Sequence, residues 1–189
     1  MIATQTLRHE HEAILKMLDA AEEVSRRLRE RQAVEPDVLD GLLEFFREFA
    51  DRCHHGKEEE ALFPLLEERG VPRTGGPIGV MLQEHDQGRA LIAEMVEAAS
   101  AYRRSEADAG ARWAGAAAGY AQLLRGHIEK ENNILFVMAE RLLSPNEQKS
   151  LADRFEAIER DKMGEGTHQR LHAKMEELAS TIWGRTAAR

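Results

Sequence analysis

Cysteine is almost absent from this chain of 189 residues, which contains only Cys53. A single thiol forms neither an internal disulfide nor a thiolate cluster for zinc or an iron–sulfur centre. The sequence also lacks an N-terminal apolar run of signal-peptide length and any apolar stretch of about 20 residues, the length that a bilayer span requires. We therefore expect no membrane partner and a location in a reducing cytoplasm.

A surplus of basic charge is also missing. The chain has 26 Lys and Arg against 34 Asp and Glu, and its formal net charge is −8. Nucleic-acid binding depends on Lys and Arg that neutralise phosphates, so this balance argues against a nucleic-acid partner. No Gly-rich phosphate loop, dinucleotide-binding fingerprint or nucleophile motif is present, which disfavours kinase, dehydrogenase and hydrolase functions.

Apolar residues recur at helical spacing almost throughout the chain, and no convincing alternating strand interrupts them. This spacing predicts long helices over about 6–32, 36–69, 78–102 and 111–143, and shorter ones over 144–163 and 167–183. The helix over 36–69 contains Pro64, where it should kink or loosen. In the fourth helix, the residues predicted to share one face are Trp113, Tyr120, Leu124, His127, Ile134 and Met138.

These helices predict an all-α protein with one main domain. Four long helices joined by short loops favour an antiparallel up-and-down four-helix bundle over residues 1–143. Residues 144–189 are then a C-terminal helical extension packed on the bundle, opened by "SPNE" (144–147), which has the Ser, Pro and Glu of a capped helix start.

Two segments of the sequence repeat each other. "HHGKEEEALF" (54–63) and "HIEKENNILF" (127–136) both have the pattern H-x-x-K-E-x-x-x-L-F. Each is preceded by an "EH" pair, Glu10-His11 in the first half and Glu84-His85 in the second. His11 lies 43 residues before His54, and His85 lies 42 residues before His127. The sequence therefore predicts a two-helix unit that is used twice.

The repeat selects a set of candidate metal ligands. Residues four apart lie on one face of a helix, so His54 shares a face with Glu58, and His127 shares one with Glu131. His11 and His85 fall on the apolar stripes of their own helices. Without a metal, two glutamates buried together would be costly or would sit protonated. Four imidazoles and two carboxylates suit two borderline cations, so the predicted metal ligands are His11, His54, Glu58, His85, His127 and Glu131.

The ordered pattern H…HxxxE…H…HxxxE at these six positions resembles the hemerythrin-like, or HHE cation-binding, proteins over about residues 5–143. The resemblance implies a non-haem di-iron centre in a four-helix bundle, bridged by carboxylates and by an oxo or hydroxo group. Manganese or zinc are possible substitutes for the two iron ions. It also implies a small partner such as dioxygen, nitric oxide or peroxide, or alternatively a role in iron handling.

One position departs from the oxygen-carrying hemerythrins, which have an HxxxH pair on the third helix. Here the residue four after His85 is Arg89, so the set is similar to the four-His, two-Glu variant of the iron–sulfur repair and regulatory branches. If both glutamates bridge, each ion has only two histidines and keeps an open position. We therefore expect redox chemistry or sensing rather than reversible oxygen transport. Three further roles stay open. The first is catalytic turnover on peroxide or nitric oxide, and the second is iron storage, donation or repair. The third is a helical tail that reports metal occupancy to a protein partner.

The neighbours of these candidates carry weaker expectations. His55 has no counterpart in the repeat, since Ile128 aligns with it, so we expect it at the surface or behind the ligands rather than on a metal. Glu59 and Glu60 are expected on a solvated helix face.

Four further residues have open roles. Arg89 can pair with a core Glu or an anion, or extend to solvent. Tyr120 is either packed in the core or donates a hydrogen bond near a ligand. His168 and His172 have the spacing of a weak metal pair, but the tail that carries them is expected to cover one end of the bundle.

Overall fold

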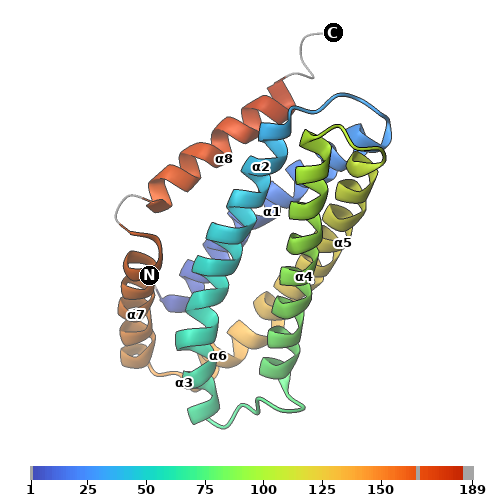
Figure 1. Cartoon of the computed structure of the whole chain (residues 1–189). Helices are drawn as coiled ribbons and strands as arrows, with labels where there is room; N and C mark the ends of the chain where they lie inside the picture. The colour runs from blue at the N-terminus through green and yellow to red at the C-terminus, as the bar shows by residue number, and fades with distance from the viewer. Residues whose placement is uncertain (1, 165–166, 185–189) are drawn as a thin grey trace.

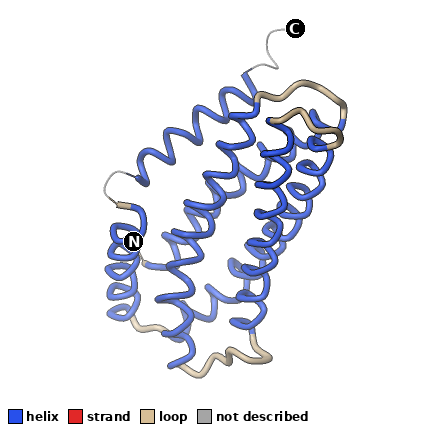
Figure 2. Tube along the Cα trace, viewed as in Figure 1, coloured by secondary structure: helices blue, strands red, loops and turns tan. Residues whose placement is uncertain are grey.

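The computed structural model describes residues 2–164 and 167–184. All regular structure in this part of the chain is helical, and it includes no strand (Figure 2), which confirms the all-α prediction. Four long rods lie alongside one another, and two further helices follow them (Figure 1). The rods are α1 (Ala3–Arg29); α2 (Pro36–Glu44) with η1 (Phe45–His55), η2 (Glu58–Leu62) and α3 (Phe63–Glu68); α4 (Pro77–Arg103); and α5 (Ala109–Lys130) with η3 (Glu131–Leu135) and α6 (Phe136–Leu142). The last two helices are α7 (Pro145–Met163) and α8 (Thr167–Gly184).

The helix ends follow local sequence signals. Pro36 opens α2 within its first turn, where a missing N–H removes no helical hydrogen bond. Ser144 caps α7: its backbone N–H donates to Glu147 Oε2 at 2.8 Å, and its hydroxyl accepts from the Glu147 N–H at 3.4 Å. Gly164 ends α7 with a φ of 75°, a conformation that glycine adopts without strain. The predicted helix start at "SPNE" is therefore confirmed.

Three segments of the rods, labelled η, are π-helical, with i→i+5 hydrogen bonds in wider turns. The segments η2 and η3 begin at Glu58 and Glu131, the two predicted carboxylate ligands, and each is five residues long. The pattern returns to α-helical at Phe63, one residue before Pro64, where the sequence predicts a loosened helix. Such turns are rare in proteins and occur often at functional sites.

The π-helical turns change which side chains face inward. Ile134 lies inside η3 and is 52% exposed, although α-helical spacing predicts it on the inward face. The prediction for Ile134 is wrong because it assumes one angular step per residue along the whole rod. A wider turn rotates the residues that follow it away from that spacing.

The apolar core divides into two clusters along the length of the rods. One contains Ile14, Phe46, Ile92 and Leu124, and the other contains Leu7, Leu62, Met81 and Leu135. Every rod therefore passes from one cluster to the other, and the predicted metal ligands occupy the level between them. The two apolar clusters exclude water from that level on both sides.

The helices α7 and α8 follow each other along the side formed by α1 and the α2–η1–η2 rod (Figure 1). Leu151 and Phe155 of α7 belong to one apolar cluster, and Leu171 and Ile182 of α8 belong to the other. The tail thus covers a side of the rods, whereas the sequence-based expectation places it across one end. Among the described residues, no helix is long and apolar enough to cross a bilayer.

Candidate metal centre

All six predicted ligands lie together between the two apolar clusters. Each of the four rods contributes at least one of them, and none is more than 1% exposed: His11 from α1, His54 from η1, Glu58 from η2, His85 from α4, His127 from α5 and Glu131 from η3. Long helices from distant parts of the chain thus bring six ionisable side chains into a space without solvent contact.

The imidazoles form two pairs, and the glutamates lie between the pairs. The Nε2 atoms of His11 and His54 are 3.1 Å apart, and those of His85 and His127 are also 3.1 Å apart. Glu131 reaches both pairs, with Oε2 3.1 Å from His11 Nε2 and Oε1 3.1 Å from His127 Nε2. Glu58 also reaches both, at 3.8 Å from His54 Nε2 and 3.5 Å from His85 Nε2. Each carboxylate therefore has one oxygen for each pair.

A second ring of side chains determines the direction of the imidazoles. Each ring uses its Nδ1–H to donate a hydrogen bond outward: His11 to Asn132 Oδ1 at 3.0 Å, His54 to Glu10 Oε2 at 2.8 Å, His85 to Glu59 Oε1 at 2.7 Å, and His127 to Glu84 Oε2 at 2.9 Å. With the proton on Nδ1, each Nε2 carries a lone pair that points into the group. Histidine ligands of metals are commonly held in this way.

The inward atoms fit a pair of cations. Two neutral rings that each keep their proton on Nδ1 cannot hydrogen-bond through Nε2 atoms 3.1 Å apart, because neither Nε2 then has a proton to donate. The oxygens of Glu58 and Glu131 are buried and accept no hydrogen bond of good geometry. Buried acceptors without donors are costly unless a positive charge lies among them. Imidazole nitrogen and carboxylate oxygen are donor types that iron, manganese and zinc accept.

The pKa values in this group agree with that interpretation. Burial, followed by the nearby Glu131 carboxylate, raises the pKa of Glu58 well above its ordinary value, so without a cation this carboxyl holds a proton. Burial also lowers the pKa of His54 to about 4, so His54 is neutral near pH 7. For Glu10, burial alone would raise the pKa, but hydrogen bonds and charges of His54 and Lys57 lower it to about 2. Glu10 therefore stays charged behind His54.

His55 is buried, which excludes the surface and leaves the other predicted position, behind the ligands. Its exposed fraction is 3%, and its ring stacks on the ring of His85 with centroids 3.9 Å apart. Ligand atoms of His55, Glu58, His85 and His127 all lie within 4.8 Å of one another, and those of His11, His54, Glu58 and Glu131 do so as well. The structure thus contains two groups able to hold a metal, with Glu58 in both.

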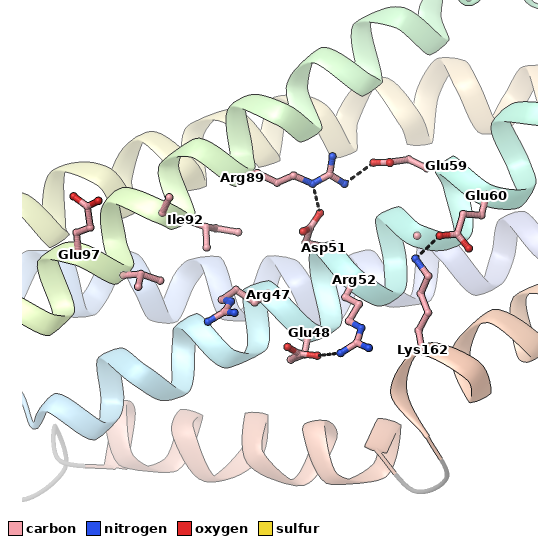
Figure 3. Close-up of a pocket in the computed structure, with 13 residues that line it drawn as sticks. Arg47, Glu48, Asp51, Arg52, Glu59, Glu60, Arg89, Ile92, Glu97 and Lys162 are labelled. Carbon is pink, nitrogen blue, oxygen red and sulfur yellow. Dashed lines mark hydrogen bonds and ion pairs between the residues drawn. The ribbon is translucent and has the colours of Figure 1, made fainter.

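Glu59 and Arg89 lie directly behind the group that contains His55. Glu59 Oε1 accepts from His85, so its predicted role as a merely solvated side chain is wrong. The Arg89 guanidinium donates to this same oxygen at 2.6 Å and to Asp51 Oδ1 at 2.8 Å (Figure 3), as expected if Arg89 pairs with a glutamate. These side chains line a surface cavity of about 800 Å³ and separate it from the histidines.

The other candidate residues take no part in the inner group. His9 is exposed and bonds to Glu12, facing away from the centre. Tyr120 packs on Phe46 with ring centroids 4.9 Å apart, and its buried hydroxyl has no hydrogen-bond partner among the described residues. Cys53 is a buried core residue, and burial raises the pKa of its thiol to about 12. The side chains of His168 and His172 lie outside the described part of the chain.

Sequence reasoning missed the outer acceptors Asp51, Glu59 and Asn132, and it did not decide between the surface and a position behind the ligands for His55. The "EH" pairs were a usable signal for two others, because Glu10 holds His54 and Glu84 holds His127. The adjacent histidines of "HH" were the only local hint for His55, and α-helical spacing argues against placing both inward.

Comparison with known proteins supports a cation-binding domain. The sequence model of the "Hemerythrin HHE cation binding domain" matches residues 2–139. An uncharacterized protein of Mycobacterium tuberculosis (strain H37Rv) is 24% identical over 180 residues, which cover 95% of this chain and 70% of that protein. The iron-sulfur cluster repair protein YtfE of Escherichia coli (strain K12) is 31% identical over 112 residues, covering 57% of this chain and 50% of YtfE. YtfE of Enterobacter is 36% identical over 89 residues, or 46% and 40% of the two chains. The matched region thus spans half or less of the YtfE proteins.

Proposed function

Because the chain belongs to the hemerythrin HHE cation-binding domain family, we propose that it is a non-haem di-iron protein that binds, senses or reacts with dioxygen, nitric oxide or peroxide. In this proposal two iron ions, with an oxo or hydroxo bridge, are held by His11, His54, Glu58, His85, His127 and Glu131. Manganese or zinc are possible substitutes.

The observation that carries this proposal is the convergence of unpaired acceptors. Four Nε2 lone pairs and four carboxylate oxygens meet in a space without solvent, and each glutamate reaches both histidine pairs. A purely structural polar core would pair its donors with its acceptors. Here all the donor N–H groups point outward, so the inner atoms support binding of cations.

We also propose the finer fold that the family implies: an antiparallel up-and-down four-helix bundle built from a repeated helix pair. Matching contacts support the repeat, because Glu10 bonds both His54 and Lys57, and Glu84 bonds both His127 and Lys130. The predicted boundary between bundle and tail at residue 143 is part of the same proposal.

The two irons would supply the redox chemistry and the binding position for the small molecule. The protein keeps each Nε2 free for a metal through the outer hydrogen bonds, and its apolar clusters exclude bulk water from the reacting level. Only a small molecule fits such a buried centre, which favours diatomic ligands or peroxide. Neither nucleic acid nor a membrane has a role in this proposal.

Metal analysis with optical and Mössbauer spectra on anaerobic and aerated protein tests the proposal. We expect about two irons per chain and a near-ultraviolet oxo-bridge band that responds to dioxygen, azide, peroxide or nitric oxide. An iron content well below two, without an oxo-bridge absorption, would contradict it.

The YtfE relatives favour a second candidate function, in which the centre stores or donates iron or repairs iron centres. The test is iron transfer: the loaded protein is mixed with an apo iron–sulfur acceptor or with a chelator. Rapid iron loss and restoration of the acceptor would favour donation or repair. Slow loss, together with a spectral response to small molecules, would favour the first function.

A further inference from the structure

The geometry points to His55 as a fifth histidine ligand, so that the two metal positions are unequal: one with His55, His85 and His127, the other with His11 and His54. This inference rests on the proposed di-metal function and deepens it. It concerns a residue of the α2–η1–η2 rod, whereas the position that supplies a fifth histidine in the resembling oxygen carriers is occupied here by Arg89.

The first observation is that His55 has the same outer hydrogen bond as the four predicted ligands. Its Nδ1–H donates to Asp51 Oδ1 at 3.3 Å, which leaves Nε2 as the atom available for a metal. His9 differs from these buried histidines: its hydrogen bond to Glu12 is exposed to solvent and directs no nitrogen toward the centre. Asp51 therefore relates to His55 as Glu10 relates to His54.

The second observation is the position of the His55 ring beside two ligands. It lies 3.9 Å from the His85 ring at an interplanar angle of 14°, and 5.6 Å from the His127 ring at 76°. Its ligand atom and those of Glu58, His85 and His127 lie within 4.8 Å of one another. These ligand atoms are close enough to share one ion once the His55 ring turns out of its stack on His85, and three imidazoles with one carboxylate are a common ligand number for a bound transition metal.

The third observation is that Arg89 supports this position from outside. Its guanidinium joins Asp51 and Glu59, the two carboxylates that hold His55 and His85. In Figure 3 Arg89 reaches from its own helix to both carboxylates, and all three residues line the surface cavity. One arginine thus fixes the acceptors of two neighbouring histidines. At the other position the two acceptors have separate cations, because Arg8 donates to Asn132 Oδ1 at 3.2 Å and Lys57 donates to Glu10.

A fifth histidine changes the expected chemistry. With three histidines at one position and two at the other, the ion held by His11 and His54 would have fewer protein ligands and would be the one to bind a small molecule. The absence of HxxxH on the third helix then no longer argues against reversible oxygen binding, because His55 restores the histidine count from another helix.

Counting the coordinated imidazoles tests the inference. The full-length apoprotein is loaded with Co²⁺, and proton NMR is used to count the strongly shifted, exchangeable imidazole N–H signals. Every inner ring donates its Nδ1–H to a protein acceptor, so each coordinated ring should give one such signal. We expect one signal each from His11, His54, His55, His85 and His127.

The variant His55→Phe keeps a flat ring for stacking on His85 and removes both nitrogens. We expect it to lose one shifted signal and to bind one of its two Co²⁺ ions at least about tenfold more weakly in a chelator competition, with the other ion unchanged. Ile128→Ala is the matched control, since Ile128 is buried at the aligned position and has no ligand atom. The Ile128→Ala variant should keep every shifted imidazole signal and wild-type affinity for both Co²⁺ ions.

Asp51→Asn keeps His55 and covers the case in which His55→Phe does not fold. It should shift two exchangeable signals if His55 is coordinated: that of His55 and, through Arg89 and Glu59, that of His85. If His55 is only packed against His85, only the His85 signal should shift. The fifth ligand alone would be overturned if the wild-type protein binds two Co²⁺ ions but shows four shifted signals, and if His55→Phe binds both ions with wild-type affinity. Wild-type protein that binds fewer than two ions would overturn the proposed di-metal function itself.

Discussion

The segments 54–63 and 127–136 have the same pattern, yet the structure completes them differently. In both, the first histidine and the lysine share one upstream glutamate: Glu10 for His54 and Lys57, and Glu84 for the second segment. Their surroundings differ, because the side chain of Lys57 is 1% exposed whereas that of Lys130 is 39% exposed. A repeated local pattern thus reproduces the ligand contacts but not the environment behind them.

The helix α7 accounts for much of this difference in exposure. Glu159 of α7 accepts from Lys57 at 2.9 Å, and Lys162 pairs with Glu60, so the tail covers the first segment. The residue type also differs at five of the ten aligned positions, and two of these are His55 against Ile128 and Glu59 against Asn132. The two halves therefore supply matching inner ligands, while the first half adds charge, a further histidine and the contact with the tail.

The largest effect is expected from removing one matched ligand in each half. His54→Ala and His127→Ala should each abolish the di-iron optical signal and lower the iron content from about two to about one or fewer per chain, because each pair loses one of its two imidazoles. Metal analysis and absorption spectra measure this, with exposed His9→Ala as the control. Loss of the signal in only one variant would show that the two halves do not contribute equally.

Replacing the two matched lysines should reveal the difference in burial between the two halves. Lys57→Met leaves the buried Glu10 without its cation and should lower the free energy of unfolding by about 3–5 kcal/mol. Lys130→Met removes a largely solvated partner of Glu84 and should cost at most about 1 kcal/mol. Urea denaturation of both apoproteins measures the difference. Equal losses would mean that cover by α7 has no energetic consequence.

The pKa values of the matched histidines His54 and His127 should shift in opposite directions in the apoprotein. Burial lowers the pKa of His54 to about 4, so its contribution to stability is complete above pH 6.5 and is lost as the pH falls through 4. For His127, burial would lower the pKa, but the Glu131 charge raises it to about 9, so its contribution is complete below pH 6.5 and is lost as the pH rises through 9. The two histidines together therefore favour greatest apoprotein stability near pH 6.5, and loss of the Glu58 proton, whose pKa burial raises, adds to the decline on the alkaline side.

Denaturation of the apoprotein between pH 4 and 9 measures this dependence. In His127→Gln the decline on the alkaline side should flatten while the acid side is unchanged. A stability curve with no decline above pH 6.5 in the wild type would contradict the opposite titration of the two histidines.

The smallest effect is expected at Arg89. Arg89→Met removes the cation that joins Asp51 and Glu59, so these hydrogen-bond acceptors of His55 and His85 become less constrained. Hydrogen-bond partners of metal ligands contribute about 10- to 100-fold to metal affinity. Arg89 contacts those partners rather than the ligands, so iron should be lost to a chelator only a few-fold faster. Arg47→Met is the control, because Arg47 lines the same cavity. Equal rates in the two variants would assign Arg89 to surface charge alone.

Much of the fold and of the inner site was predictable from the sequence. The helix limits depend on local signals such as Pro36 and the Ser144 cap, and these signals predict helix starts that the structure confirms. The convergence of His54 with Glu58 and of His127 with Glu131 follows from a spacing of four residues within one helix. His11 and His85 were found because the repeat placed them at matching distances upstream.

The same reasoning failed where the helix departs from the α-helical spacing. Ile134 lies inside η3 and was assigned to the wrong environment, and His55, at the end of η1, was left between the surface and a position behind the ligands. An apolar spacing of 3.6 residues does not indicate where a helix widens into π-helical turns. Glu59 was misassigned for a related reason, since its partner His85 is 26 residues away on another rod.

The sequence by itself determined the helices, the repeated ligand pairs and the family, because each depends on residue types at short or repeated spacing. Only the tertiary structure decided that His55 lies inside, that Asp51, Glu59 and Asn132 hold imidazoles, and that α7 covers one half of the centre. Those features are contacts between rods that are far apart in the chain. They depend on how the rods pack and where their turns widen, and no local pattern of side chains encodes that arrangement.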